Sequence, residues 1–160
     1  MATQPIMDGH APLITWTKEL SVGIEEIDGQ HRVLVDLINQ LHFAIVEHRA
    51  ASESAAILER LIEYTRIHFA VEESLMRLFD YDDYEHHKAG HEALIDEIRR
   101  LHERVVTEGK PATFELLHFL KKWLTHHILG EDMRYVPFFL SRGVQQRYQK
   151  VSWLHRLWHR

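Results

Sequence analysis

The chain has 160 residues, with 24 acidic and 19 basic side chains, a formal net charge of −5 at pH 7, and no cysteine. This length fits one domain with a substantial core, and the absence of cysteine excludes disulfides and thiolate metal ligands. There are only seven glycines and four prolines, and no segment alternates apolar with polar residues as a strand would. The composition therefore predicts an all-α protein.

The first residues lack the basic start and apolar centre of a signal peptide. No apolar run approaches the ~20 residues of a membrane-spanning helix. We therefore expect a cytoplasmic protein. Residues 141–160 hold five basic and no acidic side chains, so residues 1–140 carry a net charge of −10. An acidic body argues against binding to nucleic acid.

In chain order, residues 1–20 form a predicted irregular arm, because prolines and a glycine interrupt them. Its apolar residues, Ile14, Trp16 and Leu20, are expected to tether it across the rest of the fold. Four amphipathic helices follow, the first from about residue 24 or 27 to residue 48, and each has an apolar seam at helical spacing. The seams are Ile27, His31, Leu34, Ile38, Leu41 and Ile45; Leu58, Leu61, Thr65, His68, Glu72, Leu75 and Phe79; Tyr84, His87, His91, Leu94, Ile98, Leu101 and Val105; and Leu117, Leu120, Leu124 and His127.

The connections between these helices are short. Ser52 suits the start of the second helix, Gly109 a C-terminal cap of the third, and Pro111 the first turn of the fourth. Short connections between four seams predict an antiparallel up-down-up-down four-helix bundle over residues 21–140.

Each seam contains histidine or glutamate, residue types that can act as metal ligands. His68 with Glu72, and His87 with His91, are separated by four residues, which places each pair on one helix face. His31 lies near the start of the first helix and His127 near the end of the fourth. An antiparallel bundle brings all of these positions to one end. Imidazole and carboxylate donors converging in a core predict a transition-metal site.

A further acid is expected beside His127, and two are available. Asp132 is five residues on, which a regular α-helix rotates about 140° away from His127. Both face the core only if the helix ends, unwinds or bulges between them, most easily at Gly130. Glu131, at the regular four-residue spacing, is the geometric competitor. Spacing alone leaves both acids open.

These residues resemble the hemerythrin family, and specifically its bacterial single-domain members, over roughly residues 14–139. The resemblance rests on four segments taken together: Ile27-Asp28-Gly29-Gln30-His31; His68-Phe69-x-x-Glu72-Glu73-x-x-Met76; His87-x-x-x-His91; and Trp123-Leu124-x-x-His127-Ile128-x-x-x-Asp132.

The resemblance implies a centre of two Fe ions. One ion would be held by His87, His91 and His127, and the other by His31 and His68. Glu72 and Asp132 would bridge the pair, together with a solvent-derived oxo or hydroxo group, so the family pattern selects Asp132 over Glu131. The ion with two histidines would keep an open position for O₂ as ligand.

The family also places an apolar O₂ pocket at Leu34, Phe69 and Leu124. No acid or base is offered there to cleave O₂. We therefore expect a protein, not an enzyme, that binds O₂ reversibly for storage, delivery or sensing. The alternatives are a di-iron enzyme of the same fold acting on peroxide or nitric oxide, and a structural or signalling bundle that uses zinc or no O₂ chemistry.

The remaining histidines are interpreted as surface residues or as neighbours of the site: His10, His42, His48, His86, His102, His118, His126, His155 and His159. Trp16 and Tyr135 match aromatic positions of the family and are expected to seal the site end. The sequence departs from the family at Asp80, which stands before Tyr81 where a glycine is usual. Aspartate tolerates left-handed turns, so the hairpin should persist.

The second departure from the family is residues 141–160. The apolar residues Val144, Tyr148, Val151, Leu154 and Trp158 recur there at helical steps, and Arg147, Lys150, Arg156 and Arg160 take most of the other face. This pattern predicts an extra basic amphipathic helix. It either packs on the acidic bundle or binds a membrane surface or a protein partner. The sequence leaves the oligomeric state open.

Overall fold

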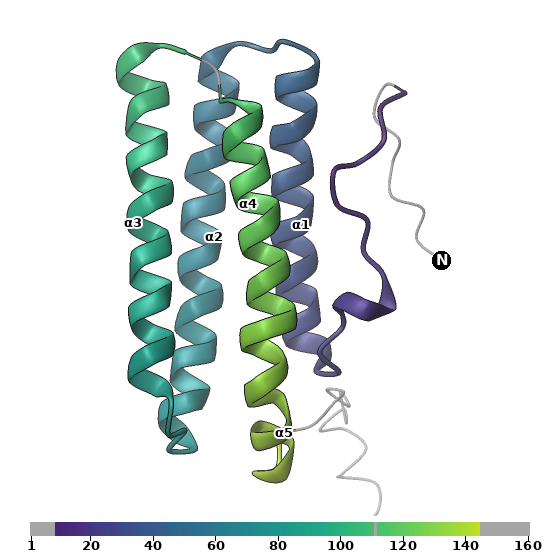
Figure 1. The fold of residues 1–160 in the computed structure, drawn as a ribbon, viewed down its shortest axis with the longest axis vertical. Coiled ribbons are helices and arrows are strands. Elements are labelled where there is room, and N and C mark those ends of the chain that lie inside the picture. Colours follow the sequence, from purple (N-terminus) through teal and green to yellow (C-terminus); the bar gives the residue numbers. More distant parts are fainter. Residues whose placement is uncertain (1–8, 111, 145–160) are drawn as a thin grey trace, which may run out of the picture.

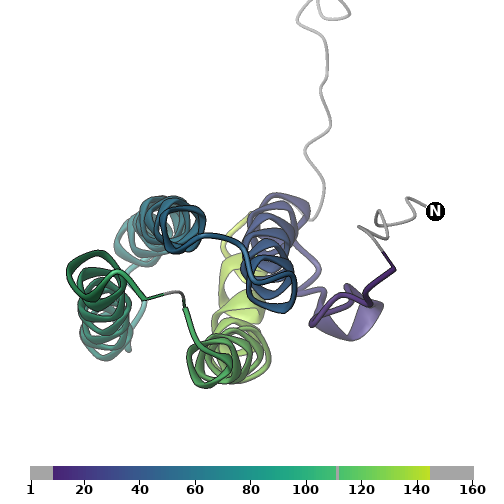
Figure 2. The same ribbon diagram turned by 90° about the horizontal axis from the view of Figure 1, so that it is seen from above.

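The computed structural model describes residues 9–110 and 112–144, and the regular secondary structure within these ranges is entirely helical. Helices α1 (Glu25–Val46), α2 (Ala51–Leu78), α3 (Tyr84–Glu108) and α4 (Phe114–His126) run alternately up and down in Figure 1. Viewed from above in Figure 2, they surround a common interior. The predicted antiparallel four-helix bundle is confirmed.

The predicted seams supply the core of this bundle. Many of their aliphatic residues are no more than 2% exposed, including Ile27, Leu34, Ile38, Leu41, Leu58, Leu61, Ile98, Leu117 and Leu120. Full burial of one such side chain contributes about 1.5–3 kcal/mol. Most of this apolar core lies in the half of the bundle away from the histidines, and it holds the four helices together there.

The two long hairpins turn through residues in the left-handed region. Asp80 has φ 56°, and the amides of Asp80 and Tyr81 donate to the carbonyls of Arg77 and Met76. This is a Schellman cap, in which glycine is the usual residue at the left-handed position. Asp80 thus fills the position as predicted. His48, with φ 52°, makes the same turn after α1, which the sequence did not suggest.

The start of α2 differs from the prediction. The helix begins at Ala51 after Ala50, and no side chain caps it, so Ser52 is not the cap. The amides of Glu53 and Ser54 donate instead to the Ala50 carbonyl, because the preceding left-handed turn already directs the chain into the helix. At the other junction Gly109 ends α3 with φ 61°, as expected, but α4 begins at Phe114, so Pro111 is not in its first turn. The hydroxyl of Thr113 accepts a hydrogen bond from the Leu116 amide at the start of α4.

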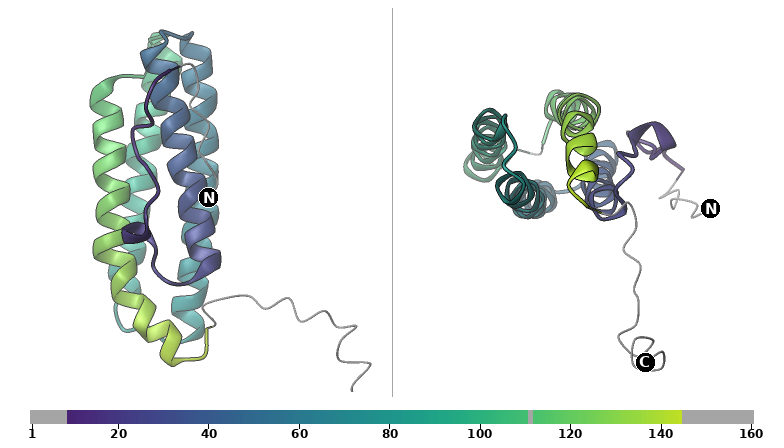
Figure 3. Two further views of the ribbon diagram at one scale, coloured as in Figure 1. Left: turned by 90° about the vertical axis from the view of Figure 1, so that its right-hand side faces the viewer. Right: turned by 90° about the horizontal axis from the view of Figure 1, so that it is seen from below.

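The N-terminal arm lies along the bundle beside α1, as Figure 3 shows. Ile14 is buried, and its amide and carbonyl pair with the Asn39 side chain at 2.9 and 2.8 Å. The Arg32 guanidinium lies 4.9 Å from the centre of the Trp16 ring. The arm then forms the short 3-10 helix η1 (Lys18–Leu20) before α1. The predicted tether is therefore present, fixed mainly by one buried asparagine.

Beyond His126 the last helix changes its winding. Residues His127–Asp132 form the π-helix η2, and Met133–Ser141 continue as α5. Gly143 ends this segment in the left-handed region. Of the predicted amphipathic helix over residues 141–160, only residues 141–144 are described, so the helix and its surface- or partner-binding interpretation remain predictions.

Candidate metal centre

The antiparallel helices bring the predicted ligand positions to one end of the bundle. His31 is in the second turn of α1, His68 and Glu72 lie in the later part of α2, and His127 and Asp132 bound η2. In Figure 1 these segments all lie toward the lower end, where α5 also sits. The fold thus places the predicted ligand positions at the same end of the bundle, as the seams predicted.

Five side chains form one buried group there. His31, His68, Glu72, His127 and Asp132 each present a nitrogen or oxygen atom, and these atoms all lie within 4.8 Å of one another. The His68 Nε2 atom is 3.2 Å from Nε2 of His31 and 3.3 Å from Nε2 of His127. The Glu72 Oε1 atom is 2.7 Å from His68 Nε2, and Asp132 Oδ2 is 2.6 Å from His31 Nε2.

This group has more acceptor atoms than protons to share among them. Three imidazole nitrogens point at one another, and a neutral imidazole carries only one N–H. The buried atoms without a hydrogen-bond partner include Glu72 Oε2 and both carboxylate oxygens of Asp132. Buried polar atoms are nearly always satisfied, so such a concentration of lone pairs calls for a cation. The nitrogen and oxygen donors suit a transition-metal ion.

His91 stands at the edge of this group. Its Nε2 atom lies 3.2 Å from Glu72 Oε2, and its other ring nitrogen, Nδ1, is 2.9 Å from Glu73 Oε1. Glu72 therefore has one oxygen directed toward His68 and the other toward His91. This is the arrangement expected of a carboxylate placed between two metal positions.

His87 is buried beside the group but is not part of it. Its Nδ1 atom is 3.3 Å from Glu131 Oε2, and its Nε2 atom is 3.6 Å from Asp83 Oδ2. Its ring centre lies 6.4 Å from that of His91. The buried Nε2 atom has no hydrogen-bond partner. The structure thus brings six of the seven predicted ligands into contact and leaves the seventh, His87, next to them.

The geometry distinguishes the two competing acids. Asp132 is fully buried and approaches both His31 and His127, whereas Glu131 is partly exposed and faces His87. The cause is the π-helix, whose hydrogen bonds join residues five apart and so bring His127 and Asp132 onto one face. The predicted break in regular winding is therefore a π-helix. Gly130 within it has no positive φ, so the bulge does not require a glycine.

Burial and charge perturb the titration of this group. Burial lowers the pKa of His31 well below its usual range, and the neighbouring His68 lowers it further. Burial alone would raise the pKa of Glu72, but the imidazoles of His68 and His127 outweigh it and hold that pKa well below normal. Burial, and then the charge of Glu72, raise the pKa of Asp132 well above its usual range. Without a cation, ionisation of Glu72 thus disfavours ionisation of Asp132, because two negative charges would lie close together in a buried site.

Three neighbouring side chains hold the group from outside. The Tyr135 hydroxyl donates to Glu72 Oε1 at 2.8 Å, and Gln30 Oε1 lies 2.7 Å from Nδ1 of His68. Glu73 holds His91 in the same way. These hydrogen bonds were not expected from the sequence, although Gln30 and Glu73 adjoin His31 and Glu72 in the chain. Their position next to predicted ligands was the one feature of the sequence that could have suggested these contacts.

The residues expected to form the apolar pocket, Leu34, Phe69 and Leu124, are all buried. The Phe69 ring stacks on His91, with centres 3.6 Å apart and planes 5° apart. Trp123 stacks on His127 at 5.3 Å and 16°. These stacking contacts restrict the orientation of the His91 and His127 rings. They also place the Phe69 ring beside the buried group of histidines and carboxylates.

The other histidines of the described ranges are not buried. His10, His48, His86, His118 and His126 are exposed, and His42 and His102 are partly exposed. The contrast confirms their interpretation as surface residues, and it fixes the register at His87 and His127 against their exposed neighbours. His155 and His159 lie outside the described residues.

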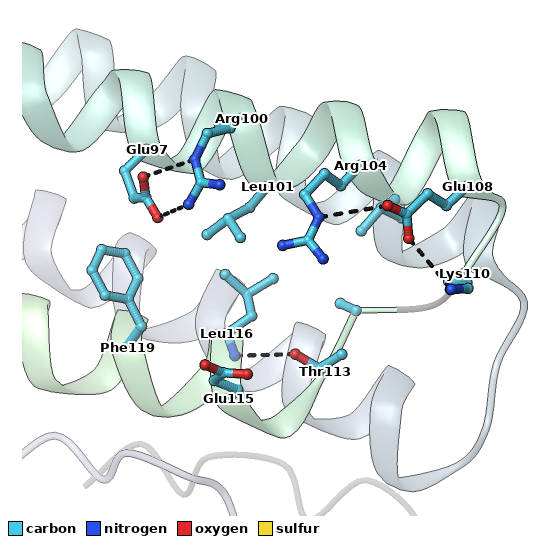
Figure 4. A pocket seen from close by; sticks show the side chains of 12 residues that line it. Glu97, Arg100, Leu101, Arg104, Glu108, Lys110, Thr113, Glu115, Leu116 and Phe119 are labelled. Carbon is cyan, nitrogen blue, oxygen red and sulfur yellow. Dashed lines mark hydrogen bonds and ion pairs between the residues drawn. The ribbon is translucent and has the colours of Figure 1, made fainter.

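The described surface also has grooves that are lined by other kinds of side chain. One of about 450 Å³ lies between α3 and α4 at the opposite end of the bundle (Figure 4). Its floor is apolar, and Arg100, Arg104 and Lys110 on its walls pair with Glu97 and Glu108. The three cations of this groove thus already contact acidic side chains. Within the described ranges, no helix is both long and apolar enough to cross a membrane.

Known proteins resemble this chain along most of its length. The family model for the hemerythrin HHE cation binding domain matches residues 22–139. Bacteriohemerythrin of Stenotrophomonas maltophilia is 33% identical, covering 90% of this chain and 94% of the relative. Bacteriohemerythrin of Pseudomonas aeruginosa is 38% identical, covering 77% and 79%. A crystal structure of wild-type hemerythrin has a TM-score of 0.73 and 31% identity, covering 78% of this chain and 96% of that one. With its bundle and its buried histidine and carboxylate group, the chain belongs to the hemerythrin family.

Proposed function

We propose that this protein holds two iron ions and binds O₂ reversibly. The observation that carries the proposal is the buried group of histidine and carboxylate atoms at one level of the bundle, with too few protons to satisfy one another. Family membership supports the same conclusion. Hemerythrin-family proteins use such a site for a pair of ions.

The proposed ligands are those expected from the sequence. His31 and His68 would hold one ion, and His87, His91 and His127 the other. Glu72 and Asp132 would lie between the ions, which fits the two oxygens of Glu72 directed toward His68 and His91. His87 fits as the last ligand because it is buried beside the group and keeps an unpaired Nε2 atom.

A bound iron pair would supply the reversible coordination of O₂. The chain's own residues control the surroundings of that chemistry. Leu34, Phe69 and Leu124 form an apolar wall that keeps water from the site. Tyr135 holds Glu72 in place through its hydroxyl. Imidazoles outnumber carboxylates among the donors, and fewer anionic donors favour lower oxidation states of the ions. This donor set suits release of intact O₂ better than its cleavage.

The test begins with metal analysis of the purified protein, for which we expect two irons per chain. The reduced protein is then exposed to O₂ and to vacuum, and an absorption spectrum that appears and fully reverses supports the proposal. His87→Ala and His127→Ala should lose iron, while the matched controls His86→Ala and His126→Ala, at exposed neighbouring positions, should keep it. Catalytic turnover of peroxide or nitric oxide without reversible O₂ binding would replace this function with the enzyme alternative. Zinc in place of iron would overturn both.

A further inference from the structure

The imidazoles of His68 and His91 both contact Glu72 through Nε2. On the opposite side of each ring, Nδ1 meets an outer side chain, Gln30 or Glu73, and these two side chains have similar shapes but different charges. On one side, His91 directs Nε2 to Glu72 Oε2 at 3.2 Å, and its Nδ1 atom lies 2.9 Å from the Glu73 carboxylate. On the other, His68 directs Nε2 to Glu72 Oε1 at 2.7 Å, and its Nδ1 atom lies 2.7 Å from the Gln30 amide oxygen. The two arrangements differ mainly in the charge of the outer residue.

An ion bound at each Nε2 atom would fix how each ring is protonated. When Nε2 of an imidazole faces a cation it carries a lone pair, so the proton resides on Nδ1 and must be donated to an acceptor. Glu73 and Gln30 both offer an oxygen acceptor at hydrogen-bonding distance. Such outer acceptors fix ring orientation, and an anionic acceptor also makes the imidazole a stronger donor to its ion.

We propose that Glu73 and Gln30 are a pair of positioning residues that orient His91 and His68 and set the reduction potential of the centre through their difference in charge. This inference rests on the proposed function. The carboxylate of Glu73 stabilises additional positive charge on the ion held by His91. The neutral amide of Gln30 gives the His68 side no such stabilisation. The centre is therefore electrostatically unequal across Glu72.

The environment of Glu73 favours this role. Its side chain is only 23% exposed, so its charge is partly shielded from water. It lies in a surface groove of about 410 Å³ between α2 and α3, together with Phe69 and His91. Glu92 lines the same groove and follows His91 in the chain, but its side chain is 66% exposed and pairs with Lys88. Glu92 is thus an acid near the site whose charge is not directed at a ring nitrogen.

The test separates two properties of Glu73 and Gln30, the charge of the side chain and its capacity to accept a hydrogen bond. Glu73→Gln keeps an acceptor and removes the charge, so the reduction potential should rise while metal affinity stays near that of the wild type. Gln30→Glu keeps an acceptor and adds a charge, so the potential should fall. Glu73→Ala and Gln30→Ala remove the acceptor, and each should weaken metal binding about 10–100-fold. Glu92→Gln is the matched control and should shift the potential far less than Glu73→Gln.

The inference is overturned if Glu73→Gln and Glu92→Gln shift the potential equally, or if Gln30→Glu leaves it unchanged. Wild-type affinity in both alanine variants would also overturn it. Metal content and reversible O₂ binding of the wild type are measured first. If the wild type binds an ion other than iron, the proposed function fails, and the alanine affinities still decide whether the two residues orient the ligands.

Discussion

Asp132 provides the sharpest test of how this site is built, because replacing it should have opposite effects with and without metal. Its carboxylate is fully buried beside Glu72 and contacts the imidazoles of His31 and His127 without a well-aligned hydrogen bond. An unsatisfied buried polar group costs roughly 1–3 kcal/mol, and a charged one more. Asp132→Asn removes the charge and nearly preserves the shape. We therefore expect the metal-free variant to be more stable at neutral pH by about 1–3 kcal/mol.

The pH dependence has a defined sign. The pKa of Asp132 is raised in the folded chain above the ordinary value of 3.8, mainly by burial. A group of this kind favours folding most below its ordinary pKa, and that contribution is lost as the pH rises through the folded-state value. The asparagine variant cannot lose it. Its advantage in the free energy of unfolding should therefore increase as the pH rises from about 4 toward neutrality.

The assay is urea unfolding of metal-free protein across that pH range, repeated after metal loading. With metal bound, the charge of Asp132 becomes favourable, so Asp132→Asn should bind metal more weakly and gain less stability from it. Glu131→Gln is the comparison variant and should weaken metal binding less than Asp132→Asn, since Glu131 is partly exposed and contacts His87 rather than the central group. A metal-free Asp132→Asn protein that is less stable than wild type would refute the reasoning. So would loss of metal in Glu131→Gln with full loading in Asp132→Asn.

Four other substitutions test separate parts of the structure. Tyr135→Phe should lower the free energy of unfolding by about 1.5–3 kcal/mol, measured with urea, because a buried hydrogen bond to Glu72 is lost. Gly130→Ala should keep metal content and alter stability by less than about 1 kcal/mol, because the added Cβ meets nothing closer than 3.5 Å. Asp80→Gly should raise the free energy of unfolding by about 0.5–1 kcal/mol, and with it the melting temperature, because glycine adopts the left-handed conformation without the steric strain of a side chain. Leu124→Ala should keep iron but speed oxidation of the O₂-loaded protein, followed by absorbance, because Leu124 is buried and belongs to the proposed O₂ pocket. A Tyr135→Phe protein as stable as wild type, loss of metal in the Gly130→Ala protein, an unchanged melting curve for Asp80→Gly, or unchanged oxidation in Leu124→Ala would contradict these assignments.

The helices were predictable from the sequence because their signals are local. Apolar seams with a steady helical period fix which face is buried, and Gly109 and Thr113 mark a helix end and a helix start by their own chemistry. The start of α2 was not predictable in this way. It depends on a left-handed turn at His48, and although histidine is enriched among non-glycine residues at positive φ, a single histidine does not mark such a turn.

The site was predictable to the level at which helical spacing carries information. Spacing placed the histidines and Glu72 on inward faces, and it required a break in winding between His127 and Asp132. It did not specify a π-helix, because the local sequence is also compatible with a helix end. Nor did it identify Gln30 or Glu73 as outer partners, since each meets a ring carried by a different helix. Contacts between helices depend on their rotation and height, which a single seam does not determine.

The two ends of the bundle have different physical roles. At the ligand end, packing is incompatible with full hydrogen bonding unless a cation is present, because His31, Glu72 and Asp132 all retain unpaired buried atoms. At the other end, the same four helices bury mainly aliphatic side chains. Because each helix spans both ends, we expect the apolar half to hold the ligands at one level without metal. Metal binding would then order the site and would not have to fold the chain.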